Sequence, residues 1–218
     1  MSLLSALGSV PMASVAPQMA LFHTHDNALP EGFCWLPQFL PPAKADHAFS
    51  ALKTELNWQA QTLHLYGREV MQPRLVAWYG DPQARYTYSG RTQTPQPWTT
   101  TLSALRTTIE HFQHTRFNSV LANRYRDGRD SMAWHSDNEP ELGAQPVIAS
   151  LSLGATRAFH LRHRTTRQSV RLLLAHGDLL IMQGDSQRDW QHCIPKTARP
   201  VGERVNLTFR WVHPSPSP

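Results

Sequence analysis

The second half of this 218-residue chain consists of short runs in which apolar and polar residues alternate. A period of two is typical of β-strands that bury one face, and glycines between the runs favour turns. Eight such runs with no helical run between them predict an antiparallel sandwich or jelly roll. The predicted strands cover residues 118–126, 132–137, 146–153, 156–163, 168–174, 178–183, 189–194 and 203–212.

Two amphipathic helices are predicted ahead of this β-rich part. Residues 43–57 follow Pro41 and Pro42, and residues 99–114 begin with a Thr run that can supply an N-cap. Apolar residues recur in both segments at steps of three and four, which is the helical period. The first apolar face is Ala45, Phe49, Leu52 and Leu56, and the second is Leu102, Leu105, Ile109 and Phe112. The expected fold class is therefore α+β and β-rich.

Both ends of the chain are expected to be flexible tails. Residues 1–28 lack Lys and Arg and are interrupted by prolines, which does not match a signal peptide. Residues 214–218 alternate Pro and Ser. The chain contains no run of eighteen apolar residues, so no membrane span is predicted. We expect a cytoplasmic protein, because its two cysteines, Cys34 and Cys193, do not form a disulfide scaffold.

The charged residues favour an anionic partner. There are 21 basic and 16 acidic residues, and 18 of the basic residues are Arg. The planar guanidinium group matches carboxylate and phosphate, so nucleic acid is the first partner to consider. A codon bias that places arginine on an ordinary solvated surface explains the same composition equally well.

His135 and Asp137 are candidate metal ligands. Residues two apart on a strand share a face, so both side chains would point to the same side of the sheet. A third ligand would complete a two-histidine, one-carboxylate set, which leaves open positions on ferrous iron. His192, in another predicted strand, is the best candidate. The alternative is a surface histidine beside an acidic loop.

The strand 203–212 has two chemically different faces. Its polar face carries two guanidinium groups about 20 Å apart at most. If that face lines a barrel interior, the two buried cations need anionic partners, and a dicarboxylate could bind both. The alternative is an edge strand with a solvated polar face. The polar face is Arg204, Asn206, Thr208 and Arg210, and the apolar face is Val205, Leu207, Phe209 and Trp211.

Two further groups of residues can contact a ligand. Asn123 and Tyr125 share one face of the strand before His135 and could orient a carboxylate, although a tyrosine satisfied within the core is an equally good explanation. Trp78, Tyr86 and Tyr88 lie among arginines, a combination that suits bases and phosphates. Packing within a hairpin explains such aromatics as well. Tyr66 lies in a predicted exposed turn and could wedge into a base stack.

With these motifs in order, the chain resembles the AlkB family of Fe(II)- and 2-oxoglutarate-dependent nucleic-acid dealkylases, over roughly residues 60–213. The likeness is greatest to the branch with the human nuclear DNA and RNA repair homologues and similar bacterial enzymes. The motifs are Pro73-Arg74, Trp78-Tyr79-Gly80, Tyr86 to Ser89, Asn123-Arg124-Tyr125, His135-Ser136-Asp137, Ile148 to Phe159, His176-Gly177-Asp178, Trp190-Gln191-His192 and Arg204 to Arg210.

The resemblance implies a fold and an organisation of the chain. The core is a double-stranded β-helix, which is a jelly roll, and it carries N-terminal helices and a nucleotide-recognition lid. Residues 29–116 would form the helices and the lid, and residues 117–213 the catalytic core. Residues 1–28 and 214–218 would be the flexible tails.

The resemblance also implies roles for the motif residues. His135, Asp137 and His192 would bind Fe(II), and Arg204 would bind the far carboxylate of 2-oxoglutarate. The other predicted cosubstrate contacts are Arg210, Asn123, Tyr125 and Thr208, with Asn206 nearby. Trp78, Tyr86 and Tyr88 would form the lid, and His135 would stack beneath the flipped base.

Three positions near the predicted substrate complete this set. By the resemblance, Tyr66 would correspond to the finger that intercalates into the base stack. Relatives often have an acidic residue just after the ligand Asp, whereas this chain has Asn138 there, followed by Glu139. Either of the two could therefore face the base.

The implied activity is oxidative demethylation of 1-methyladenine and 3-methylcytosine in DNA and RNA, with O2 as co-reactant and formaldehyde as product. We expect a monomer without membrane contact. Two other functions stay open. One is an Fe(II)/2-oxoglutarate oxygenase for a protein or small molecule, and the other is a non-catalytic nucleic-acid-binding module.

Overall fold

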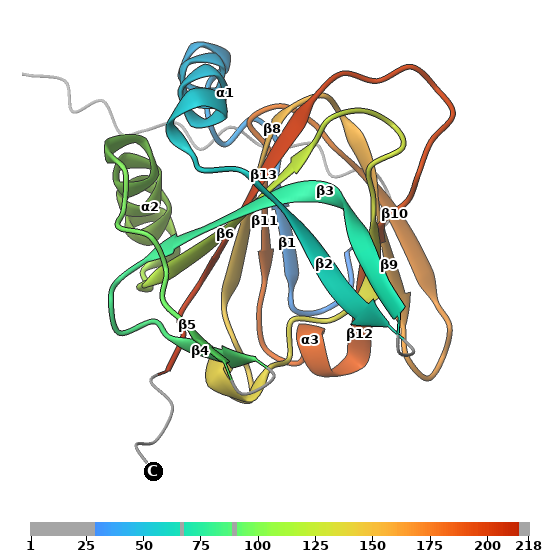
Figure 1. The fold of residues 1–218 in the computed structure, drawn as a ribbon. Coiled ribbons are helices and arrows are strands. Elements are labelled where there is room, and N and C mark those ends of the chain that lie inside the picture. Colours follow the sequence, from blue (N-terminus) through green and yellow to red (C-terminus); the bar gives the residue numbers. More distant parts are fainter. Residues whose placement is uncertain (1–28, 66–67, 89–90, 214–218) are drawn as a thin grey trace, which may run out of the picture.

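The protein is seen here in a computed structural model that describes residues 29–65, 68–88 and 91–213. Two antiparallel β-sheets pack face to face, and helices α1 (Pro42–Glu55) and α2 (Thr100–Gln113) lie on the outer side of the larger sheet (Figure 1). This β-rich arrangement with few helices confirms the predicted jelly roll. The predicted tails, residues 1–28 and 214–218, lie outside the described residues.

All eight predicted core strands form, and each sheet takes four of them. The larger sheet has the order β1-β11-β8-β13-β6-β3-β2, and the smaller has the order β10-β9-β12-β7. The core strands of the larger sheet are β6 (Ser119–Tyr125), β8 (Ile148–Gly154), β11 (Leu179–Met182) and β13 (Arg204–Arg210). Those of the smaller sheet are β7 (Met132–His135), β9 (Arg157–His163), β10 (Ser169–Leu174) and β12 (Trp190–Ile194).

The two faces of β13 show why the sequence folds in this way. Its apolar residues Val205, Leu207 and Phe209 are fully buried in the cluster that includes the helices. Its polar residues point the other way, into the space between the sheets, because successive side chains of a strand alternate. Burial of the apolar face on the helices therefore fixes which side chains line the interior.

The helices match the sequence pattern with small differences at their ends. Pro42 occupies the first turn of α1, where its missing N–H costs no hydrogen bond. Thr99 caps α2, and its hydroxyl accepts a hydrogen bond from the Leu102 N–H at 3.2 Å. Phe112, predicted on the apolar face, is 46% exposed and packs edge-on against Phe39.

Three strands that the period-two pattern did not predict extend the larger sheet. They are β1 (Phe33–Leu36), β2 (Gln59–Leu65) and β3 (Arg68–Gly80). Pro73 interrupts the pattern of β3, because a proline argues against a regular strand. In the structure it lies before the residues of β3 that pair with β6, and where the β2–β3 register shifts.

Four short elements complete the fold. They are β4 (Tyr86–Tyr88), β5 (Arg91–Gln93), a short 3-10 helix over Pro140–Leu142 and α3 (Ser186–Asp189). Ala84, Leu142 and Val212 are buried together, which ties the chain before β4 to the loop after β7. The chain that leads into the β4–β5 hairpin therefore packs against the segment that follows β7.

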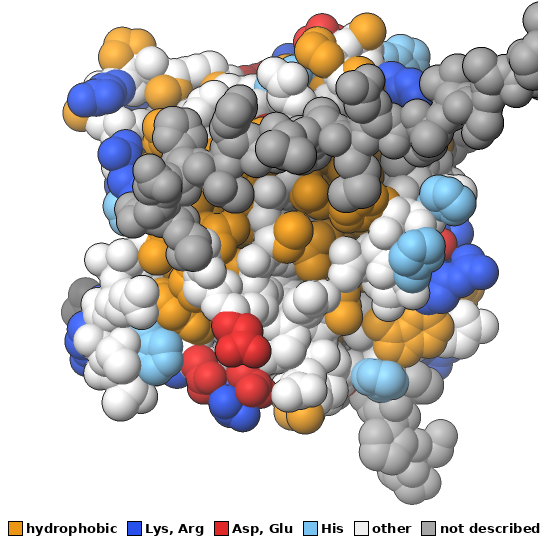
Figure 2. All heavy atoms as spheres, turned by 180° about the vertical axis from the view of Figure 1, so that it is seen from behind, with side chains coloured by type: hydrophobic (Ala, Val, Ile, Leu, Met, Phe, Trp, Pro, Cys, Tyr) orange, Lys and Arg blue, Asp and Glu red, His pale blue; other side chains and the backbone are white. Residues whose placement is uncertain are grey.

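The surface carries charge unevenly. On the face seen in Figure 2, the largest group of Asp and Glu side chains gathers near the lower edge, while Lys, Arg and His side chains lie mainly toward the sides. Among the residues that the structure describes, no helix combines the length and hydropathy needed to cross a membrane.

Candidate metal centre and cosubstrate pocket

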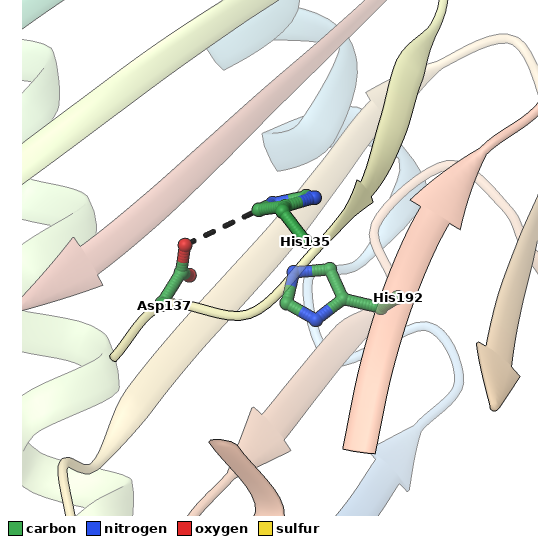
Figure 3. A group of neighbouring side chains, drawn as sticks. All are labelled: His135, Asp137 and His192. Carbon is green, nitrogen blue, oxygen red and sulfur yellow. Dashed lines mark ion pairs between the residues drawn. The ribbon is translucent and has the colours of Figure 1, made fainter. Parts of the chain in front are cut away.

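His135, Asp137 and His192 converge on one point between the sheets (Figure 3). His135 ends β7 and lies directly opposite His192 of β12, and Asp137 follows two residues later. The candidate ligand atoms all lie within 4.8 Å of one another, and His135 Nε2 is 3.8 Å from Asp137 Oδ1. In the described part of the chain, this is the one group of His, Cys, Asp or Glu residues that could hold a metal ion.

Asp137 is held as a carboxylate in a buried position. Burial alone would raise its pKa, but Arg210, His192 and His135 outweigh this and lower the pKa to about 2. Arg210 Nη2 lies 2.8 Å from Oδ2, and the Asp137 N–H donates to Gln187 Oε1 at 2.9 Å. One carboxylate oxygen is therefore bound by Arg210, while Oδ1 faces His135.

The two histidines are suited to bind a metal as neutral imidazoles. Burial, together with the nearby His135, lowers the pKa of His192 to about 3. His135 Nδ1 lies 2.8 Å from the Ala133 carbonyl oxygen, which assigns the proton to Nδ1 and leaves Nε2 as the ligand atom. The Phe159 ring stacks on His192 at 5.3 Å. A carboxylate and two neutral imidazoles form a donor set that fits Fe(II).

A cavity extends from these three residues into the interior of the jelly roll. All six residues predicted to contact the cosubstrate line it together with the three candidate ligands. The predicted cosubstrate residues are Asn123, Tyr125, Arg204, Asn206, Thr208 and Arg210. Met132, Phe159, Met182 and Ile194 add apolar walls. The cavity is thus polar along β6 and β13 and mainly apolar elsewhere.

Arg204 presents an unbalanced positive charge to this cavity. It is 1% exposed, and Nη2 donates to Ser152 Oγ at 2.9 Å. Its Nε and Nη1 are also buried and have no hydrogen-bond partner among the described residues. Burial lowers the pKa of Arg204 to about 10, which still leaves it a cation at neutral pH. A buried cation with unused donors requires an anionic ligand, and a carboxylate fits them.

The position of β13 decides between the two explanations of its polar face. β13 lies between β6 and β8 in the middle of the larger sheet, and its polar side chains are largely buried. The alternative of an edge strand with a solvated face is therefore wrong. Asn206 has its amide directed at its own sheet, because Nδ2 donates to Ser150 Oγ at 2.9 Å and to the Leu151 carbonyl oxygen.

Two arginines outside the predicted site residues reach the same region. Arg74 of β3 is 7% exposed, and its Nε donates to Asn123 Oδ1 at 2.7 Å. Arg157 of β9 is 2% exposed and lies over the Tyr125 ring. Arg157 lies in the predicted strand 156–163 and Arg74 in the Pro73-Arg74 motif, but the sequence does not show that either residue reaches this region, because the strand pairing that brings them there is known only from the fold.

The residues predicted to contact the substrate are less closely gathered. Trp78, Asn138 and Glu139 are absent from the cavity lining in the described part of the structure. The Trp78 indole N–H donates to Ser119 Oγ at 2.7 Å. Asn138 is exposed, and Glu139 is partly buried. Tyr86 and Tyr88 lie on β4, but their side chains are not described, and Tyr66 lies outside the described residues.

Glu139 differs from its neighbour Asn138 in one respect that bears on substrate contact. Its Oε2 is buried and has no hydrogen-bond partner among the residues that the structure describes. A buried carboxylate oxygen is costly unless it is paired. Glu139 therefore has an unused acceptor, whereas Asn138 faces solvent.

Comparison with known proteins supports the geometry. Residues 32–210 match the 2OG-Fe(II) oxygenase superfamily. The human alpha-ketoglutarate-dependent dioxygenase alkB homolog 3 is 44% identical over 193 residues, which cover 84% of this chain and 67% of that protein. The human DNA oxidative demethylase ALKBH2 is 39% identical over 181 residues, which cover 78% of this chain and 69% of that protein.

This chain belongs to the AlkB family of 2OG-Fe(II) oxygenases. A solved structure titled "The structure of OsALKBH1" has the same fold at a TM-score of 0.53 and 20% identity, covering 84% of this chain and 100% of that one. The cofactors of the family are Fe(II), 2-oxoglutarate and O2. The residues present fit them, because the cavity combines a two-histidine, one-carboxylate set with the buried donors of Arg204.

Proposed function

We propose that this protein repairs alkylated nucleic acid by oxidative demethylation of 1-methyladenine and 3-methylcytosine in DNA and RNA. The observation that carries the proposal is the single cavity in which His135, Asp137 and His192 share walls with the buried cation of Arg204. The similarity to proteins named DNA oxidative demethylase supports the substrate class. The basic character of the chain, +5 at neutral pH, suits a phosphate-bearing partner.

In this proposal His135 Nε2, His192 and Asp137 Oδ1 hold Fe(II). Arg210 binds the second carboxylate oxygen of Asp137 and so keeps Oδ1 turned to the metal. The bound iron, with 2-oxoglutarate and O2, supplies the oxidation of the N-methyl group, and formaldehyde, succinate and CO2 are the products.

The interior residues bind and orient the cosubstrate. Arg204 takes its distal carboxylate through Nε and Nη1, while Tyr125, Asn123 and Thr208 contact the rest of the molecule. Arg74 fixes the Asn123 amide by the hydrogen bond to its oxygen, which leaves Nδ2 as the donor toward the cavity. The apolar walls exclude water from the reacting groups.

The substrate base reaches the metal from the end of the jelly roll near β4 and β5. Trp78, Tyr86 and Tyr88 form the lid over it, Tyr66 enters the base stack, and His135 stacks beneath the flipped base. The unused acceptor of Glu139 favours it over Asn138 as the group that meets a cationic methylated base. Residues 29–116 thus supply helices and lid, and residues 117–213 the catalytic core.

The proposal is tested by mass spectrometry of oligonucleotides that contain 1-methyladenine or 3-methylcytosine. Single- and double-stranded forms are incubated with protein, Fe(II), ascorbate and 2-oxoglutarate. Loss of 14 mass units per lesion, with matching formaldehyde, is expected, since a methyl group is replaced by hydrogen. Succinate formation that no methylated oligonucleotide stimulates would indicate a protein or small-molecule substrate. Nucleic-acid binding without any succinate would indicate a binding module.

We also propose that the protein acts as a cytoplasmic monomer. Size-exclusion chromatography with light scattering measures the oligomeric state, and a dimer at working concentration would contradict the proposal.

A further inference from the structure

Arg157, at the start of β9, is a buried arginine that the proposed chemistry does not use. It is 2% exposed, and its guanidinium donates to three main-chain carbonyl oxygens. These belong to Asp127 at 3.0 Å, Asp130 at 2.8 Å and Pro195 at 2.8 Å. No carboxylate in the described residues forms a salt bridge with it.

The three carbonyls join parts of the chain that carry the site. Asp127 and Asp130 lie in the loop between β6 and β7, which leads to His135. Pro195 directly follows β12, the strand of His192. The Arg157 side chain therefore links the β6–β7 loop to the residue after β12, at the end of β7 opposite His135. A lysine could not reproduce this arrangement, since its single ammonium group lacks the planar fork.

The same guanidinium lies over the ring of Tyr125, a residue that lines the proposed cosubstrate pocket. Its Cζ is 5.6 Å from the centre of the Tyr125 ring, and the Cζ of Arg204 is 5.2 Å from the centre of the same ring. Tyr125 is 2% exposed. Arg157 and Arg204 thus share one buried aromatic ring, although their like charges repel each other.

We propose that Arg157 is a positioning residue for the binding of 2-oxoglutarate. It strengthens this binding by holding the Tyr125 ring in place against Arg204. The inference rests on the proposed role of Arg204 as the carboxylate-binding group. A long arginine side chain loses much conformational freedom when it is fixed, and a wall that fixes it in advance lowers the cost of binding. Without Arg157, the Tyr125 ring and the Arg204 guanidinium gain freedom, and the bound carboxylate must restrict both.

The test measures binding rather than turnover. Calorimetry gives the Kd of 2-oxoglutarate for the Mn(II)-loaded protein and the Kd of Mn(II) itself, and thermal melting checks the fold. Arg157→Met is expected to weaken 2-oxoglutarate binding about tenfold while leaving Mn(II) binding unchanged. Arg157→Lys keeps the charge but loses the three-carbonyl contact, so it is expected to weaken binding as well. The control is Arg116→Met, which removes an 82% exposed arginine.

A double-mutant cycle shows whether Arg157 acts through Tyr125. If it does, Arg157→Met combined with Tyr125→Leu binds 2-oxoglutarate no more weakly than the weaker single variant. Fully additive losses would overturn the inference. Wild-type 2-oxoglutarate affinity in folded Arg157→Met protein would also overturn it, and so would an equal loss of Mn(II) affinity. Failure of both Arg157 variants to fold would overturn it as well, because the contact would then have a purely structural role.

One further variant separates this inference from the proposed function. Arg204→Met should abolish measurable binding of 2-oxoglutarate. If it binds normally, the proposed role of Arg204 fails and the inference fails with it. If Arg204→Met loses binding while Arg157→Met and Arg157→Lys keep it, the inference alone is wrong.

Discussion

His135 and His192 are direct cross-strand partners, and their rings lie 4.2 Å apart between centroids. β7 and β12 are far apart in sequence but adjacent in the smaller sheet. This pairing brings the two imidazoles to one face, and Asp137 joins them as the chain leaves β7. The candidate metal centre is thus a consequence of one strand register, because a shift by one residue would turn His192 to the outer face.

The first prediction concerns the ligand set. His135→Ala should lower formaldehyde release by at least about 100-fold, because a three-ligand site cannot hold the metal with one imidazole missing. Affinity for a methylated oligonucleotide should stay within about twofold, since phosphate contacts dominate it. Formaldehyde assays and fluorescence anisotropy measure the two quantities, with His111→Ala as the control. Equal loss of both would assign His135 a folding role.

The second prediction concerns the ion pair between Arg210 and Asp137. Arg210→Met should weaken Mn(II) binding by about 10–100-fold, because the carboxylate loses the partner that orients it. Arg188→Met is the matched control, since Arg188 pairs with Asp185 and Asp189 on the surface. Metal titration followed by calorimetry gives both affinities. Unchanged Mn(II) affinity in the Arg210 variant would remove this orienting role.

The third prediction concerns two glycines with positive φ. At Gly154, with φ of +89°, an added Cβ would meet the Glu203 carbonyl oxygen at 2.4 Å and the Phe49 ring. At Gly184, with φ of +57°, nothing lies within 4 Å. Gly184→Ala should therefore cost only about 1 kcal/mol of unfolding free energy, whereas Gly154→Ala should cost clearly more. Denaturant unfolding compares them, and equal losses would contradict this explanation.

The fourth prediction concerns pH and Glu203. A hydrogen bond from Lys53 lowers the pKa of Glu203, and Arg124 adds to this against the opposing effect of burial. A carboxylate with a lowered pKa in the folded state stabilises the fold above its ordinary pKa of 4.5, and this stability is lost as pH falls through the folded pKa.

Glu203→Gln removes that pH-dependent contribution. The difference in unfolding free energy between wild type and variant should be largest near neutral pH and shrink as the pH falls below about 4.5. Denaturant unfolding at several pH values measures it. A difference that stays constant down to pH 3 would show that the ionisation of Glu203 does not matter for stability.

The sequence by itself determined the two long helices, the eight core strands and the chemistry of their faces. The period of two located all eight core strands, and the alternation in β13 separated its buried polar residues from the apolar face. The spacing of His135 and Asp137 predicted that both side chains face one side, and they do meet, although β7 ends at His135 and Asp137 lies in the segment that follows it. These features are local, and local periodicity carries them.

Only the tertiary structure decided which distant residues meet. The register of β7 against β12 brings His192 to His135, and the folding of β9 brings Arg157 to the Tyr125 ring. β3 was missed because Pro73 breaks its pattern, and its place next to β6 brings Arg74 to Asn123. Pairing between strands far apart in sequence depends on how whole sheets bury their apolar faces, and no short window of sequence contains that information.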